Sequence, residues 1–225
     1  MREIALDTET TGLNPKSGHR VVEIGCVEMV NHIATGEVFH AYINPKRDMP
    51  EEAFKVHGLS EEFLKDHPVF ADVADGFIDF IGDSPLVIHN AAFDMGFLNW
   101  ELENLKRPSL DMDRAIDTVK MARKKFPGAQ ANLDALCRRF GIDNSNRELH
   151  GALLDAQLLA DVYLELMGGR QTGFGLNVEK TDEGDAEIKI EKPQQREARS
   201  FAPTSDELTA HAEFIEKLTD PLWRT

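Results

Sequence analysis

A chain of 225 residues, 41% of them hydrophobic, is long enough for one domain with a full core plus an appendage. Its two cysteines, Cys26 and Cys137, lie in apolar patterns without metal-ligand spacing, which argues against a disulfide framework and suits a reducing compartment. We see neither a signal-peptide pattern nor an apolar run near the roughly 18 residues of a membrane span. We therefore expect a cytoplasmic protein that does not enter membranes.

The formal net charge of −15 sets a second limit. Nonspecific nucleic-acid binding depends on Lys and Arg side chains that displace counterions from phosphates, so this chain is a poor candidate for an independent DNA-binding module. If it acts on nucleic acid, it must hold its substrate through metal ions and local contacts, or receive it from another protein. The charge agrees with a subunit of a larger assembly.

In chain order, the first half predicts a hairpin-rich sheet followed by helices. Residues 2–9, 21–30 and 37–44 are rich in β-branched and apolar residues, and residues 34–36 between the last two segments predict a hairpin turn. A helical turn at 50–54 and a second one opened by Ser60 follow. Apolar spacing then predicts a helix over 69–81, a buried strand at 86–88 and a helix over 92–105.

The second half is mostly helical. A weak strand at 114–116 precedes a helix that ends near 126, and Asn132 caps a helix through 140. A polar loop at 142–149 leads into a helix over about 150–167, which Gly168 and Gly169 stop. Strands followed mainly by helices predict a mixed α/β domain around one sheet, but this pattern alone leaves its topology open.

The end of the first strand carries two carboxylates. Residues two apart in a strand point to the same face, so Asp7 and Glu9 lie side by side. Adjacent anions repel each other, and a divalent cation that prefers oxygen ligands would relieve the repulsion. The alternative is an acidic strand end that faces water, and this stretch alone leaves both interpretations open.

Two further carboxylates stand near helix starts. Asp94 falls in the first turn of helix 92–105, and Asp155 lies at the centre of the apolar arc of the last helix, opposite its polar stripe. A carboxylate on an apolar face needs a partner, which could equally be a structural Arg or Lys. His150 stands five residues before Asp155 and is a candidate general base, although a histidine there without the carboxylates would be an ordinary loop residue.

Together, D-x-E on a strand, N-x-x-F-D at one helix start and H-x-x-x-x-D at another resemble the DEDD exonucleases, in the branch that carries this histidine. The similarity extends to the proofreading subunits of bacterial DNA polymerase III over about residues 3–170. It is carried by Val56–Leu59, Ile88–Asp94, Phe126–Gly128, Leu133–Cys137 and Leu149–Asp155, and the ending Leu222–Arg224 also looks similar.

This resemblance implies a ribonuclease H-like fold, a five-stranded mixed sheet flanked by helices. It implies a 3′→5′ exonuclease that removes mismatched nucleotides from DNA 3′ ends and releases 5′-mononucleotides. Asp7, Glu9, Asp94 and Asp155 would hold two Mg²⁺ or Mn²⁺ ions, with His150 as the base. The metal ligands Asp7, Glu9 and Asp155 would also contact the substrate, as would Thr8, Glu52 and His57, although His57 could equally be a structural histidine.

The composition changes after Gly169. We expect an exonuclease domain over 1–168, a flexible linker over 169–203 and a helical segment over 204–225. Thr204 and Glu207 form a capping box, and Leu208, Ala212 and Ile215 share a face that would dock on the polymerase (alpha) subunit or fold back on its own domain. Gln171–Leu176 loosely resembles a sliding-clamp-binding peptide, and a plain linker is an equal alternative.

Two other functions compete with this prediction. The chain could be an RNA-trimming DEDD exonuclease similar to oligoribonuclease or ribonuclease T, which would not require a linker with a terminal helix. It could also be an inactive scaffold that stabilises a polymerase, although a scaffold has no need for four costly carboxylates and a base.

Overall fold

The computed structural model describes residues 1–145, 149–169 and 202–219, which divide into two compact units, Met1–Leu176 and Asn177–Thr225. Each unit is considered by itself. Within the described ranges, no helix is both long and apolar enough to span a bilayer. Cys26 and Cys137 are both buried, as the sequence predicts.

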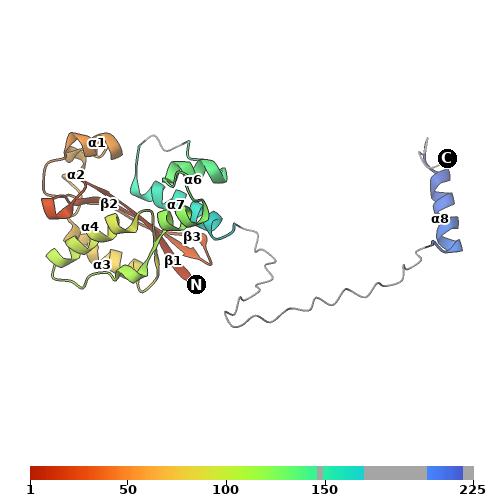
Figure 1. The fold of residues 1–225 in the computed structure, drawn as a ribbon, viewed down its shortest axis with the longest axis horizontal. Coiled ribbons are helices and arrows are strands. Elements are labelled where there is room, and N and C mark those ends of the chain that lie inside the picture. The colour runs from red at the N-terminus through yellow and green to blue at the C-terminus, as the bar shows by residue number, and fades with distance from the viewer. Residues whose placement is uncertain (146–148, 170–201, 220–225) are drawn as a thin grey trace. The chain divides into compact units, whose positions relative to one another are not determined.

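The first unit is built around a sheet with helices packed beside it, as Figure 1 shows. The sheet is mixed and has five strands in the order β3-β2-β1-β4-β5. β1 pairs antiparallel with β2, which pairs antiparallel with β3, while β1, β4 and β5 run parallel to one another. The strands are β1 Arg2–Thr10, β2 Val21–Val30, β3 Ile33–Tyr42, β4 Leu86–Ile88 and β5 Ala115–Asp117. This topology confirms the expected five-stranded mixed sheet.

Helices cover both faces of the sheet, and two short 3₁₀ turns lie at Pro15–Ser17 and Met112–Arg114. The helices of this unit are α1 Glu51–His57, α2 Glu61–Leu64, α3 Phe70–Ile81, α4 Ala91–Asn104, α5 Thr118–Lys125, α6 Leu133–Phe140 and α7 Ala152–Leu166. One core lies between the sheet and α3 and α4, and a second lies between the sheet and α5, α6 and α7. The helical segments predicted from apolar spacing are therefore confirmed.

The alternation of β1 decides which core each of its side chains enters. Ile4 and Leu6 belong to the core under α3 and α4, whereas Ala5 belongs to the core under α7. Because the period of a strand is two, Asp7 and Glu9 continue the row of Ala5 toward α7. The strand thus delivers both carboxylates to the face that carries the last helix of the domain.

The predicted hairpin turn at 34–36 is wrong. The chain turns at Asn31 and His32, whose φ angles of 53° and 67° suit a two-residue hairpin turn with both central residues in the left-handed region. Gly36 lies inside β3, where the pairing register with β2 shifts and its φ is 97°. Gly36 therefore marks a β-bulge, in which a positive φ is also common, and not the turn of the hairpin.

The second unit contains α8, which spans Ser205–Glu216. The predicted capping box is confirmed: the backbone N of Thr204 donates to Glu207 at 2.7 Å, and the backbone N of Glu207 donates to the Thr204 hydroxyl at 3.3 Å. Ile215 is buried, while Leu208 and Phe214 are exposed. The predictions for 171–176, for most of the linker and for 222–224 lie outside the described residues.

Candidate active site

The carboxyl ends of β1 and β4 meet at one edge of the sheet, because the two strands are parallel neighbours. A cavity of about 280 Å³ opens there, and all five residues predicted as metal ligands or base line it. Its lining is Asp7, Thr8, Glu9, His89, Phe93, Asp94, Asn132, Leu133, Asp134, His150 and Asp155. Segments at the start, middle and end of the domain therefore converge on one site.

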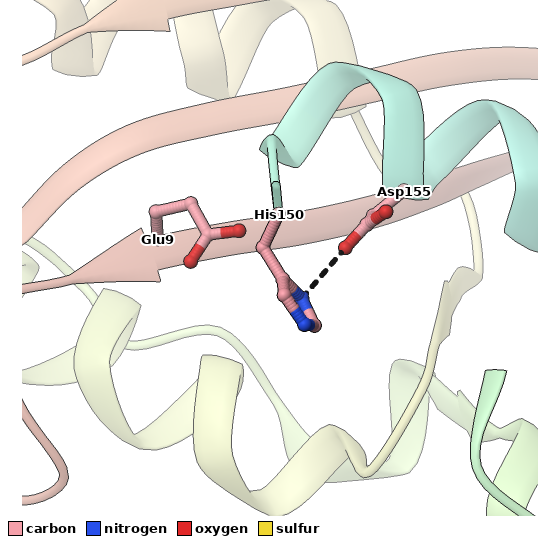
Figure 2. Close-up of side chains that lie close together, drawn as sticks. All are labelled: Glu9, His150 and Asp155. Atoms are coloured by element: carbon pink, nitrogen blue, oxygen red, sulfur yellow. Dashed lines mark hydrogen bonds and ion pairs between the residues drawn. The ribbon is translucent and has the colours of Figure 1, made fainter. Parts of the chain in front are cut away.

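Glu9, His150 and Asp155 lie close together in this cavity, as Figure 2 shows. One ligand atom from each residue lies within 4.8 Å of the others, and His150 Nδ1 is 3.2 Å from Asp155 Oδ2. Asp155 is 3% exposed, whereas the His150 side chain is 48% exposed. The imidazole thus combines a contact to a buried carboxylate with access to solvent.

Asp94 is held from the other side of β1. The Thr8 hydroxyl donates a hydrogen bond of 2.7 Å to Asp94 Oδ1, and Asp94 is 2% exposed in the first turn of α4. Burial raises the pKa of Asp94 to about 7, against the opposing effect of the Thr8 hydrogen bond. A nearby positive charge would therefore be needed to ionise this carboxyl fully at neutral pH.

The donor set suits a hard divalent cation. Five carboxyl groups line the cavity, those of the four predicted metal ligands and of Asp134, and none of the described residues that line it is a lysine or an arginine. Carboxylate oxygens are the ligands that Mg²⁺ prefers, and several anions in one poorly solvated place disfavour one another without a cation. Asp7, Glu9, Asp94 and Asp155 are thus the residues that could hold metal ions.

A glycine sets how closely the last helix approaches the sheet. Gly25 in β2 is the register partner of Asp7, and a Cβ built on it would lie 2.3 Å from the backbone carbonyl carbon of Ala152. Any side chain at Gly25 would push away the first turn of α7, which carries Asp155. Sequence reasoning missed this role, although a glycine inside a strand is a signal of close backbone approach.

A second cavity of about 440 Å³ adjoins the first, with Thr8, Glu9 and Phe93 lining both. Glu52 and His57 line this second cavity only. The structure thus divides the predicted substrate-contacting residues between two adjoining spaces.

His57 is 5% exposed, and its Nδ1 accepts a hydrogen bond of 3.0 Å from the backbone of Leu59. Its buried Nε2 has no hydrogen-bond partner among the described residues. Burial lowers the pKa of His57, the backbone of Thr10 opposes this shift, and the neighbouring His150 lowers the pKa further. The neutral ring therefore carries its proton on Nε2, which faces the backbone of Thr10 without a well-formed hydrogen bond.

Two histidines that line these cavities were assigned no role from the sequence. His89 lines the first cavity, with its Nδ1 2.9 Å from the Thr118 hydroxyl, and His19 lines the second, 3.2 Å from the Thr11 hydroxyl. His89 directly follows β4. Its position at the carboxyl end of a strand next to β1 could have identified it as a residue of the site.

Residues 4–163 match the family model described as Exonuclease, RNase T. Among solved structures, the chain is similar to exonuclease X in complex with 5′ overhanging duplex DNA, with a TM-score of 0.58 and 26% identity over 74% of this chain and 90% of that one. It also shares its fold with the nuclease domain of 3′hExo, a DEDDh family member, with a TM-score of 0.64 and 18% identity over 74% and 91% of the two chains. Fold and site together define the class of DEDDh exonucleases.

Similar proteins show to which kind of DEDDh exonuclease the chain belongs. The chain is 48% identical over 220 residues to DNA polymerase III subunit epsilon of Escherichia coli (strain K12), covering 93% of this chain and 90% of that protein. It is 56% identical over 223 residues to the subunit epsilon of Rickettsia prowazekii (strain Madrid E), covering 97% of each chain. This chain therefore belongs to the DNA polymerase III epsilon subunits, and the resemblance drawn from its motifs is confirmed.

Proposed function

We propose that this chain is the proofreading 3′→5′ exonuclease of a bacterial replicative DNA polymerase and acts in the cytoplasm. It would shorten mismatched DNA 3′ ends and release 5′-mononucleotides. The observation that carries this proposal is the convergence of the four predicted metal ligands and His150 in one cavity at the carboxyl ends of β1 and β4. Its family membership supports the same function.

Asp7, Glu9, Asp94 and Asp155 would hold two divalent cations, Mg²⁺ or Mn²⁺. Such ions, when bound, make water more acidic and neutralise charge that develops on phosphate oxygens. The chain supplies negative ligands on three separate elements, β1, α4 and α7, of which α4 is fastened to β1 by the bond between Thr8 and Asp94. This arrangement keeps the carboxylates in place before substrate arrives.

His150 would accept the proton of the water that attacks phosphorus. Its ring is solvent-accessible at the edge of the cavity, and the Asp155 carboxylate at 3.2 Å can orient it. Imidazole is the side chain that serves most often as a general base. Loss of the base should therefore slow turnover without removing the metal ligands.

The second cavity would hold the terminal nucleotide. The Nε2 proton of His57, which lacks a well-formed hydrogen bond, can donate to an oxygen of the substrate, and Glu52 can accept from a sugar hydroxyl. Phe93 lies between the two cavities and offers an aromatic face to a base, which is a sequence-tolerant contact. Thr8 and Glu9 would bring the scissile phosphate from this cavity to the metal ligands.

The α8 segment would bind the polymerase (alpha) subunit. Leu208 and Phe214 are 54% and 58% exposed, which leaves apolar surface for a partner. A tether of this kind would raise the effective concentration of the nuclease at the primer end and offset the repulsion between DNA and a chain of net charge −15. Contact of Gln171–Leu176 with the sliding clamp stays a prediction from sequence.

An oligonucleotide assay tests the proposed chemistry. The purified chain with Mg²⁺ or Mn²⁺ should release 5′-mononucleotides from the 3′ end of labelled single-stranded DNA, and excess EDTA should stop the reaction. Undiminished cleavage in EDTA would contradict the metal requirement. Cleavage confined to RNA would favour the RNA-trimming alternative, and no cleavage of either polymer would favour the scaffold.

A further inference from the structure

A positively charged surface lies on helices α5 and α6 of this acidic chain. Residues 118–141 contain six basic side chains and only one acidic side chain, Asp134, whereas the whole chain has 25 basic and 40 acidic residues. We call five of the basic residues the α5–α6 patch. All five are exposed: Arg123, Lys124, Lys125, Arg138 and Arg139.

Packing around one aromatic ring brings the two helix ends together. The Arg139 guanidinium lies 4.5 Å from the centroid of the Phe126 ring, and Lys125 Nζ lies 5.9 Å from the same centroid. Phe126 in turn packs on Phe140 with ring centroids 5.9 Å apart. Beside Arg138 and Arg139, a shallow hollow of about 450 Å³ has small or neutral neighbours, namely Ala129, Gln130 and Ala135.

The charges of the patch are largely unneutralised. Arg123, Lys124 and Arg138 make no ion pair or side-chain hydrogen bond with any residue that the structure describes. Asp134 lies one helical turn before Arg138, but its Oδ1 accepts a hydrogen bond from Asn144 at 3.0 Å. Besides Arg139 on the Phe126 ring, Lys125 has an internal role, since its Nζ donates to the last carbonyls of α7.

Helix dipoles account for part of this arrangement. Cations at the carboxyl end of a helix are stabilised by the dipole, and the patch residues stand in the last turns of α5 and α6. The dipole does not account for five like charges on two adjacent helix ends, because these charges repel one another. A polyanion that spans both ends would relieve the repulsion.

Helix α6 connects the patch to the catalytic cavity. Its beginning, Asn132 to Asp134, lines that cavity, and its last turn carries Arg138 and Arg139. Eight helical residues span about 12 Å, so the patch lies within a few nucleotides of the metal ligands. A strand with its 3′ end in the cavity can therefore pass over α6.

We propose that the α5–α6 patch binds the phosphodiester backbone of the DNA strand whose 3′ end occupies the catalytic cavity. This proposal rests on the proposed exonuclease function and adds a substrate-binding surface outside its catalytic cavity. The patch supplies local attraction in a chain that repels DNA overall. Each phosphate contact releases condensed counterions, so the contribution of the patch must depend on salt.

The test compares substrates that differ in length. Lys124→Gln and Arg138→Gln remove one charge each from exposed positions, and Lys106→Gln is a matched control at an exposed lysine outside the patch. For each protein, kcat/KM is measured with a dinucleotide and with a single strand of about 16 nucleotides, a length typical of single-strand binding sites. Thermal unfolding of each variant verifies the fold.

Each patch variant should lower the ratio of long-strand to dinucleotide kcat/KM about 5-fold near 0.1 M salt and reduce the logarithmic salt slope by about 0.7. The control should change neither quantity. An unchanged ratio and slope in the Lys124→Gln/Arg138→Gln double variant would overturn the proposal, and the patch would then suit an acidic protein surface. Failure of the unmodified chain to cleave any strand would instead overturn the exonuclease function itself.

Discussion

Helices α7 and α8 are both amphipathic, but they have opposite environments. Nine of the fifteen residues of α7 are buried, and Asp155 is among them. In α8, Ile215 is the only buried residue of twelve, and Leu208 is 54% exposed. An apolar face packed on a sheet can hold a carboxylate in a defined place, whereas an exposed apolar face remains available to a partner.

The first turns of α7 and α8 also differ in how they are stabilised. α8 begins with a complete capping box between Thr204 and Glu207, while α7 begins after Gly151 with no side-chain cap. An isolated helix of twelve residues is marginal in water and depends on such local bonds. The first turn of α7 instead lies directly against Gly25 of β2. Tertiary packing thus positions α7, and local capping stabilises α8.

The largest effect should come from the histidine next to α7. We expect His150→Gln to slow turnover by about 10²–10⁴-fold, because the general base is lost, while metal affinity persists. The matched control is His211→Gln in the exposed surface of α8, which should leave turnover unchanged. Steady-state release of mononucleotides and calorimetric Mn²⁺ binding measure the two quantities. Near-full turnover of His150→Gln would show that another group is the base.

A smaller effect should follow from displacing α7. Gly25→Ala would place a methyl group 2.3 Å from backbone atoms of α7, so the helix carrying Asp155 must shift. We expect kcat to fall about 10²-fold, the loss that a misplacement of about 1 Å can cause. Gly96→Ala is the control, since a Cβ at Gly96 meets no atom within 4 Å. Equal kcat values in both variants would show that the close approach is not needed.

The smallest effect should be that of His57 on how the unfolding free energy depends on pH. The pKa of this histidine in the folded state lies below the ordinary value of 6.5, so protonation favours the unfolded chain. The stabilisation from neutral His57 is therefore present above pH 6.5 and is lost as the pH falls. Urea unfolding between neutral and acidic pH should show a shallower loss of unfolding free energy in His57→Asn than in the unmodified chain. If the unfolding free energy had the same pH dependence in both proteins, His57 would not be a buried neutral histidine.

Local patterns predicted much of the fold and the main site. The apolar run Leu86–Ile88 marked β4 with the bounds that the structure shows, and Asn132 caps α6 as expected. The period of β1 placed Asp7 and Glu9 together, and the position of Asp155 on an apolar arc indicated its burial. These features depend on neighbours a few residues apart, which a single sequence contains.

Features that depend on distant pairing were missed. Gly36 looked like a hairpin turn, because positive φ serves both turns and bulges and only the β2–β3 register distinguishes them. The role of Gly25 depends on its contact with Ala152, far along the chain. The docking face predicted for α8 included Ile215, but its burial makes the exposed Leu208 and Phe214 better probes of a partner.

We expect nuclease activity to belong to the first unit and polymerase binding to belong to α8. The most direct test is recovery of the polymerase subunit by the full chain, by a chain ending at Leu176 and by Leu208→Asp/Phe214→Asp, with Ala210→Asp as the exposed α8 control. The truncation and the double variant should lose the polymerase and keep full cleavage of free oligonucleotides, while the control keeps both. Equal recovery of the polymerase by all four proteins would show that α8 is not the binding site. Loss of cleavage on truncation would show that the first unit alone is not the nuclease.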